Sequence, residues 1–104
     1  MADSSVERYT KIPNDILEAI MKLKLSPSQH VVFLYVLRKT YGFQKGLFGD
    51  NISINKMAKE TGYSRQCITR AVFEMEKKRI LLVAHNGSGR VGHMRINDPV
   101  DWKT

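Results

Sequence analysis

The sequence has 104 residues with one cysteine and a formal net charge of +7. This length accommodates one domain around a single core, and no apolar run approaches the ~18 residues of a membrane-spanning helix. Residues 1–7 contain no apolar signal core, so we expect a cytoplasmic protein. The lone Cys67 cannot form an internal disulfide, and we expect it to be partly buried.

The first half of the chain is predicted to be a helical scaffold. Residues 1–8 are polar and are expected to be a flexible N-terminus, followed by one domain over residues 9–104. Pro13 suits the start of a first helix, because its fixed φ is preorganised for the first turn. The apolar spacing of that helix predicts a buried stripe, made of Ile16, Leu17, Ile20 and Met21.

A second helix is predicted to begin after Ser26, which can form a capping box with Gln29. Residues 31–37 are apolar on nearly all sides of this helix, which indicates a central and buried position. His30, near its start, is expected to pack against the core rather than to bind a ligand.

The connection that follows contains aromatic residues and then a short extended segment. Tyr41 and Phe43 are expected to hold the loop against the core. Residues 51–53 are expected to form a third strand that pairs with the hairpin near the end of the chain.

The middle of the chain has the pattern of two short helices joined by a tight turn. Ser53 can cap a helix over residues 54–60, and Gly62 supplies a left-handed residue just past its end. Ser64 can cap a second helix over residues 65–78. Its buried face is predicted from apolar residues at helical spacing, namely Ile68, Ala71, Val72 and Met75.

A basic hairpin is predicted after these helices. Residues 80–84 are an apolar run, residues 85–90 are a turn cluster rich in Gly, Asn and Ser, and residues 91–96 return as a second strand. Met94 and Ile96 fall on one side of the returning strand. The predicted fold class is α+β, mostly α: a helix-turn-helix with a small antiparallel β-sheet, which is a winged helix.

The positive charge is concentrated in the same part of the chain. Residues 65–95 contain seven Lys or Arg residues and two Glu residues, so about a third of the chain carries five of the seven excess charges. Such a patch supplies the counterion-releasing part of DNA affinity. Charge alone is equally consistent with a solvated basic face, but its coincidence with a helix-turn-helix and a wing favours double-stranded DNA as the partner.

The polar side of the helix over residues 65–78 is predicted to read bases in the major groove. Arg65 and Arg70 can make bidentate contacts with guanine, and Gln66 matches adenine. Thr69 can touch a thymine methyl group or a phosphate. Alternatively, Arg65 contacts a phosphate, and Gln66 and Thr69 are ordinary exposed helix surface.

Three further residues are predicted to contact DNA around this helix. Ser64 caps the helix and can offer its hydroxyl to a phosphate. Lys77 either contacts the backbone or complements the helix dipole. Arg90 can enter a minor groove or remain in solvent, as part of a wing over residues 84–93 that lies on the backbone or in the minor groove.

No motif for catalysis or for a cofactor stands out in the sequence. His30, His85 and His93 lack further ligands at metal spacing. There is no nucleophile motif and no phosphate-cradling glycine loop, since the glycines at 87 and 89 suit a wing tip. We therefore expect no enzyme activity, no cofactor and no metal.

Residues 9–14 (YTKIPN), 38–43 (RKTYGF) and 57–65 (MAKETGYSR) also carry a family resemblance. They resemble the N-terminal domain of bacteriophage replication protein O of lambdoid phages and prophages, and the resemblance covers nearly the whole chain. Phe73 departs from the pattern, at a helix position expected to be polar.

The resemblance implies a winged helix that binds inverted-repeat sites at a phage replication origin, commonly as a homodimer. It also implies that a C-terminal region absent from this chain recruits helicase-loading proteins, and that this chain is a DNA-binding fragment or a short variant. Apolar residues outside the expected core are consistent with dimerisation: Phe48, Phe73 and Trp102. Two alternatives stay open, a winged-helix transcription regulator and a protein-interaction module in replisome assembly.

Overall fold

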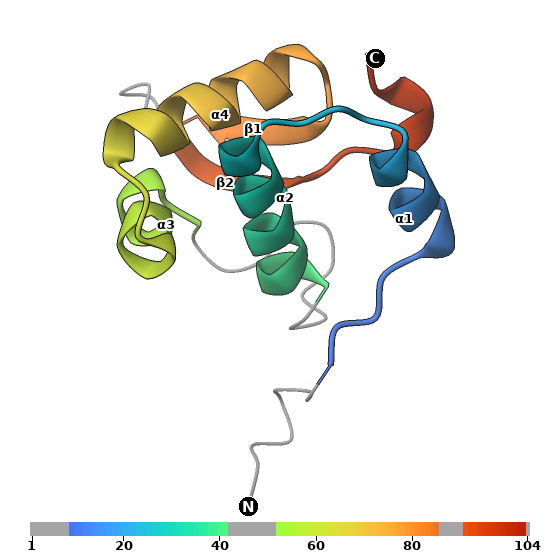
Figure 1. Cartoon of the computed structure of the whole chain (residues 1–104), viewed down its shortest axis with the longest axis horizontal. Helices are drawn as coiled ribbons and strands as arrows, with labels where there is room; N and C mark the ends of the chain where they lie inside the picture. The colour runs from blue at the N-terminus through green and yellow to red at the C-terminus, as the bar shows by residue number, and fades with distance from the viewer. Residues whose placement is uncertain (1–8, 42–51, 86–90, 104) are drawn as a thin grey trace, which may run out of the picture.

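Helices dominate the computed structural model, which describes residues 9–41, 52–85 and 91–103. Four α-helices precede a β-hairpin in the described chain (Figure 1). Their bounds are α1 Asn14–Met21, α2 Pro27–Thr40, α3 Ile54–Thr61, α4 Arg65–Lys77, β1 Leu81–His85, β2 Val91–Ile96 and a closing 3₁₀ turn, η1, Pro99–Asp101. No helix among these residues is long and apolar enough to cross a membrane.

The helix starts follow the predicted capping signals. Ser26 Oγ accepts a hydrogen bond from the Gln29 N–H at 3.3 Å, and Gln29 Oε1 accepts one from the Ser26 N–H at 3.1 Å. This is the predicted capping box of α2, with Pro27 as its first residue. Helix α1 begins one residue later than Pro13, which is its N-cap.

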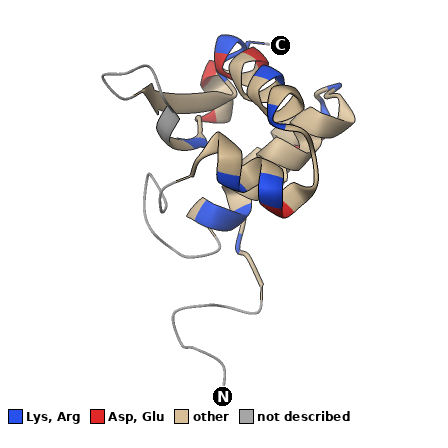
Figure 2. Cartoon of the chain, turned by 90° about the vertical axis from the view of Figure 1, so that its left-hand side faces the viewer, with Lys and Arg blue, Asp and Glu red and all other residues tan. Residues whose placement is uncertain are grey.

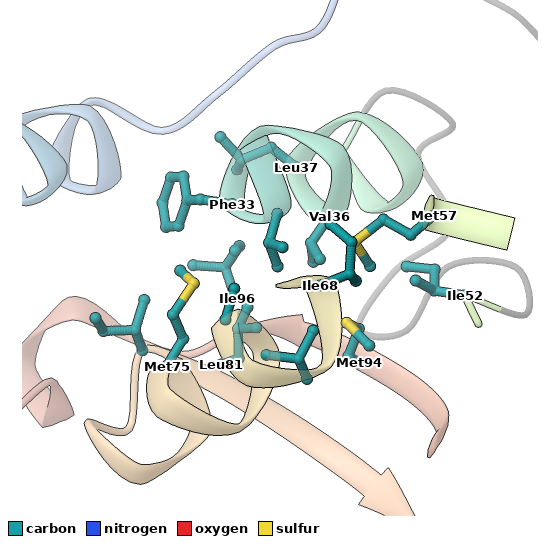
Figure 3. Packing of buried hydrophobic residues seen from close by; sticks show 14 of the residues in the cluster. Phe33, Val36, Leu37, Ile52, Met57, Ile68, Met75, Leu81, Met94 and Ile96 are labelled. Carbon is teal, nitrogen blue, oxygen red and sulfur yellow. The ribbon is translucent and has the colours of Figure 1, made fainter. Parts of the chain in front are cut away.

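The core lies between α2, α4 and the hairpin (Figure 3). The predicted buried face of α4 is confirmed, because each of its four apolar residues is at most 1% exposed. Helix α2 contributes four residues that are at most 2% exposed: Val32, Phe33, Val36 and Leu37. Its opposite side is not buried, since Leu34 is 60% exposed.

The hairpin has the predicted antiparallel arrangement, with Leu81 opposite Ile96 and Val83 opposite Met94. Met94 and Ile96 point into the core, as their positions predicted. The prediction of a third strand was wrong for its described part. Ser53 caps α3 instead, and Ile52 belongs to no strand but is buried in the core.

Two predictions of burial in the first half of the chain were also wrong. In α1, Ile16 is buried, but Leu17 and Met21 are 40% and 75% exposed. This helix has only eight residues and packs against η1 near the end of the chain, so one narrow side is covered. His30 is exposed, because it lies in the first turn of α2 beyond the edge of the core.

The end of the described chain closes the core. Trp102 is 9% exposed and meets the Phe33 ring edge-on, with centroids 5.9 Å apart. Its Nε1–H donates to the Asn97 carbonyl at 2.9 Å. Trp102 is therefore a core residue, not a surplus apolar side chain as predicted, whereas Phe48 lies outside the described residues.

Candidate nucleic-acid interface

A tight turn joins α3 to α4 and sets the direction of α4. Gly62 has φ of 81°, the left-handed conformation that glycine adopts at least cost, and its N–H donates to the Ala58 carbonyl at 3.0 Å. Ser53 caps the start of α3 by accepting from the Lys56 N–H at 3.0 Å. The predicted helix-turn-helix is thus confirmed, with α3 ending one residue later than expected.

Ser64 occupies the predicted N-cap of α4. Its Oγ accepts a hydrogen bond from the Cys67 N–H at 3.1 Å, while the residue itself is exposed. Cys67 is half-buried, as predicted. The N-terminal end of α4, with its orphan N–H groups, consequently stands at the surface next to the turn.

The polar residues predicted to read bases lie together on the first two turns of α4. Arg65, Gln66 and Arg70 are exposed, on the side of the helix away from the core. Thr69 is half-buried, and its hydroxyl donates to the Arg65 carbonyl at 2.8 Å. Its hydroxyl hydrogen is therefore used within the helix.

The two remaining predicted contact residues are Lys77 and Arg90. Lys77 is exposed in the last turn of α4, where a positive charge also complements the helix dipole. Arg90 lies outside the described residues. Figure 2, which looks onto the α3 side of the molecule, shows Lys and Arg (blue) on the helices that face the viewer, with Asp and Glu (red) among them. Lys56 and Lys59 of α3 are among the exposed basic residues.

A partly buried hydrogen bond joins the C-terminal half of α4 to α2. Gln29 is 7% exposed, and its Nε2 donates to Glu74 Oε1 at 2.8 Å. Sequence reasoning assigned Gln29 only to its capping box. No local signal pointed to the second role, because the two residues are 45 positions apart.

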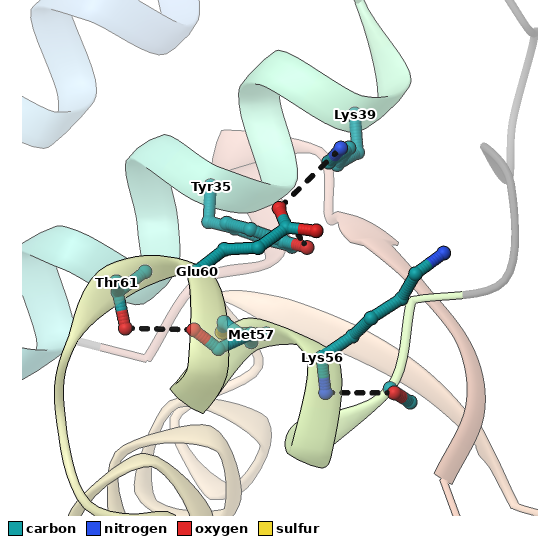
Figure 4. Close-up of polar contacts among 7 residues, drawn as sticks. Tyr35, Lys39, Lys56, Met57, Glu60 and Thr61 are labelled. Atoms are coloured by element: carbon teal, nitrogen blue, oxygen red, sulfur yellow. Dashed lines mark hydrogen bonds and ion pairs between the residues drawn. The ribbon is translucent and has the colours of Figure 1, made fainter.

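A second polar cluster joins α2 to α3 (Figure 4). The Tyr35 hydroxyl donates to Glu60 Oε1 at 3.0 Å, and Lys39 Nζ lies 3.7 Å from the same oxygen. Burial, followed by the hydrogen bond and the negative charge of Glu60, raises the pKa of Tyr35 to about 12. The hydroxyl stays protonated at physiological pH, so it can act as the donor in this contact.

The histidines do not come together as ligands. His85 lies 3.1 Å from Glu76 Oε2 on α4, and in the hairpin His93 faces Ala84 rather than His85. No group of three or more His, Cys, Asp or Glu side chains in the described parts of the chain could hold a metal ion.

The helix-turn-helix followed by an antiparallel hairpin defines this protein as a winged-helix domain. A crystal structure of the adhesin competence repressor (AdcR) from Streptococcus pyogenes is similar, with a TM-score of 0.54 and 17% identity. The match covers 82% of this chain and 57% of that one. A structure of the C-terminally His-tagged repressor gives a TM-score of 0.49 and 21% identity, over 82% and 56% of the two chains.

The family model described as bacteriophage replication protein O matches residues 2–98. The chain belongs to this family. A comparison with curated protein sequences gave no match. The family is one of phage replication proteins. The repressor likeness concerns the fold alone, and this chain spans little more than half of the repressor's length.

Proposed function

We propose that this domain binds double-stranded DNA sequence-specifically at inverted repeats of a phage replication origin, and thereby initiates DNA replication. One observation carries the proposal: a row of exposed hydrogen-bonding side chains, Arg65, Gln66 and Arg70, lies on a helix whose opposite face is locked in the core. The backbone of a helix held in this way is already ordered before binding, so only the side chains lose conformational freedom on binding.

In the proposed complex, α4 enters the major groove with its N-terminal end deepest. Arg65 and Arg70 contact guanine, and Gln66 contacts adenine. Thr69 offers its methyl group to thymine, since its hydroxyl hydrogen is held by the Arg65 carbonyl.

The flanks of α4 are proposed to position the domain on the duplex. Ser64 and Lys77 contact phosphates, and Arg90 extends the contact along the wing, over residues 84–93. Phosphate contacts of this kind fix the register without reading sequence.

The wider context is proposed from the family. The working unit is residues 9–104, acting as a homodimer on the repeats in the bacterial host cell, without catalysis of its own. Helicase-loading proteins are recruited through a further region of the family's longer members.

The first experiment identifies the DNA site. Duplexes selected from a random pool by the purified domain should contain inverted repeats, and affinity should fall linearly on a log–log plot as salt rises. A flat salt dependence favours a protein-interaction module instead. A selected site that maps to a promoter rather than to a replication origin favours a transcription regulator.

The second experiment tests the assigned readers. Arg65→Ala and Gln66→Ala should each cost about 1–3 kcal/mol on the selected duplex and relax the preference at one base pair. Lys24→Ala removes an exposed charge outside α3 and α4. This control should lower the affinity for cognate and scrambled duplexes equally. Wild-type discrimination by either α4 variant would remove that residue from the interface.

A further inference from the structure

An exposed aromatic residue of α4 meets the end of β1. Phe73 is 41% exposed, although every other large apolar residue of α4 is buried. The His85 ring lies nearly parallel to the Phe73 ring, at an angle of 8° with centroids 6.0 Å apart. This offset stacked geometry is favourable for aromatic pairs.

A hydrogen bond joins the same two elements beside the stacked rings. His85 Nε2 lies 3.1 Å from Glu76 Oε2, and their side chains are 35% and 32% exposed. Phe73 and Glu76 are three residues apart, so they project from neighbouring positions on one face of α4. His85 is consequently held by two side chains of α4 at once.

The hairpin is irregular at this point. Ala84 lies opposite His93, but His85 lies opposite Val91, so one extra residue, Gly92, stands on β2. Such a bulge bends the ribbon and increases its local twist. The bend therefore occurs where the described hairpin ends.

The alternation along β1 explains why His85 faces α4. Leu81, Val83 and His85 share one side of the strand. Leu81 is buried in the core and Val83 packs against it, so the same side continues past the core onto the exposed face of α4.

We propose that Phe73, Glu76 and His85 are positioning residues that set the angle between the hairpin and the recognition helix α4. With this angle fixed, helix and wing reach one duplex simultaneously, so the proposal rests on the proposed function. The proposed role of the three residues is to orient the hairpin, with His85 at the base of the wing. This role explains why a large aromatic residue, Phe73, lies on the exposed side of α4: its ring stacks on His85.

The test asks whether Glu76→Ala strengthens or weakens DNA binding. Removing a negative charge from a DNA-binding domain strengthens binding by simple electrostatics, and Glu18→Ala, at an exposed site on α1, measures that effect. A positioning role predicts the opposite: Glu76→Ala and His85→Ala should each weaken binding to the selected duplex by about tenfold. The double variant should lose little more than either single variant.

Two variants of Phe73 separate ring stacking from simple apolar packing. Phe73→Tyr keeps the stacked ring and should bind as the wild type does. Phe73→Leu keeps an apolar side chain without the ring and should bind as weakly as His85→Ala. Melting temperatures should change little in both variants, because Phe73 lies outside the buried core.

A measurement without DNA tests the positioning role independently of the proposed function. Residual dipolar couplings of the backbone amides report the orientation of β1 and β2 relative to α4. His85→Ala should change or average that orientation, whereas Glu18→Ala should not.

An unchanged orientation, or binding by Glu76→Ala as tight as that of Glu18→Ala, would overturn the positioning role. Loss of binding in proportion to loss of folded protein would also overturn it. By contrast, if the wild-type domain binds no duplex, the proposed function is wrong. The residual dipolar couplings still show in that case whether the three residues orient the hairpin.

Discussion

Tyr35 connects α2, the central helix, to α3, the first helix of the helix-turn-helix. Its hydroxyl donates to Glu60, and its pKa is about 12 instead of the ordinary 10.0. Because the folded state holds this proton more tightly than the unfolded state, the contribution to stability is complete below pH 10. It is lost as the pH rises through about 12.

We predict that the Tyr35 phenolate appears near pH 12 in an ultraviolet titration, identified as the difference between the wild type and Tyr35→Phe. Glu60→Gln should move this titration towards pH 10, because it removes the negative charge that opposes ionisation. Burial and the charge of Asp15 also raise the pKa of Tyr41, so the difference spectrum is needed. Titration of Tyr35 at the ordinary value would contradict the contact with Glu60.

Gln29 and Thr69 show how single side chains take on two tasks. Gln29 completes a capping box through its Oε1 and holds α4 through its Nε2. Thr69 uses its hydroxyl within α4, and its proposed task is to offer its methyl group to DNA. In both cases the chemistry of the residue type was evident from the sequence, but the partner was not.

Helix α4 ends in a Schellman motif that lacks the usual glycine. The Ile80 N–H donates to the Met75 carbonyl and the Arg79 N–H to the Glu76 carbonyl, both at 2.9 Å. Arg79 adopts φ of 61°, and Asn97 Nδ2 donates to its carbonyl at 2.8 Å. Helix α3 is followed by Gly62 instead, so both helices end in a left-handed residue, which is glycine after α3 and arginine after α4.

We predict opposite effects of substitution at these two positions. Gly62→Ala should destabilise the fold by about 1 kcal/mol from backbone conformation alone, since a Cβ there meets nothing within 4 Å. Arg79→Gly should stabilise it by up to about 1 kcal/mol by relieving the same kind of strain, less the entropy that glycine adds to the unfolded chain. Urea unfolding measures both.

A loss of stability in Arg79→Gly would show that the arginine side chain contributes more than its backbone costs. Gly62→Asn is the matched control, because asparagine tolerates the left-handed conformation better than alanine does. It should fall between the wild type and Gly62→Ala.

The segment after β2 ties the whole domain together. Asn97 N–H donates to the Ile80 carbonyl at 2.9 Å, and Lys103 N–H donates to the Lys78 carbonyl at 2.6 Å. Trp102 fills the core between these contacts, against Phe33 of α2. The last residues of the described chain therefore donate hydrogen bonds to carbonyl groups just beyond the C-terminal end of α4.

We predict that Trp102→Ala destabilises the domain by about 3–5 kcal/mol, the usual cost of deleting a large aromatic side chain from a core. Trp102→Phe should cost less, because it keeps an aromatic ring near Phe33 but leaves the Asn97 carbonyl without its donor. Val100→Ala, at an 82% exposed site in the same segment, is the control and should change stability little. Chemical denaturation of the three variants measures these costs. A loss below 1 kcal/mol for Trp102→Ala would show that the segment does not contribute to the core.

Several features could be predicted from the amino-acid sequence alone: the helix-turn-helix, its caps, the buried face of α4 and the exposure of Arg65, Gln66 and Arg70. These features depend on residues at most four positions apart, where a hydroxyl reaches an N–H or apolar side chains share a helix face. The hairpin was likewise predictable, although β1 includes His85, which was assigned to the turn.

The burial of apolar residues outside these motifs could not be predicted from the sequence, because it depends on the three-dimensional packing of the helices and the hairpin. Leu17 and Met21 are exposed while Trp102 is buried, and Ile52 enters the core without joining the sheet. The contacts of Phe73 with His85 and of Gln29 with Glu74 could not be predicted from the sequence either. Burial and long-range pairing depend on which elements meet in space, and residues far apart in the chain carry no local pattern that records their contact.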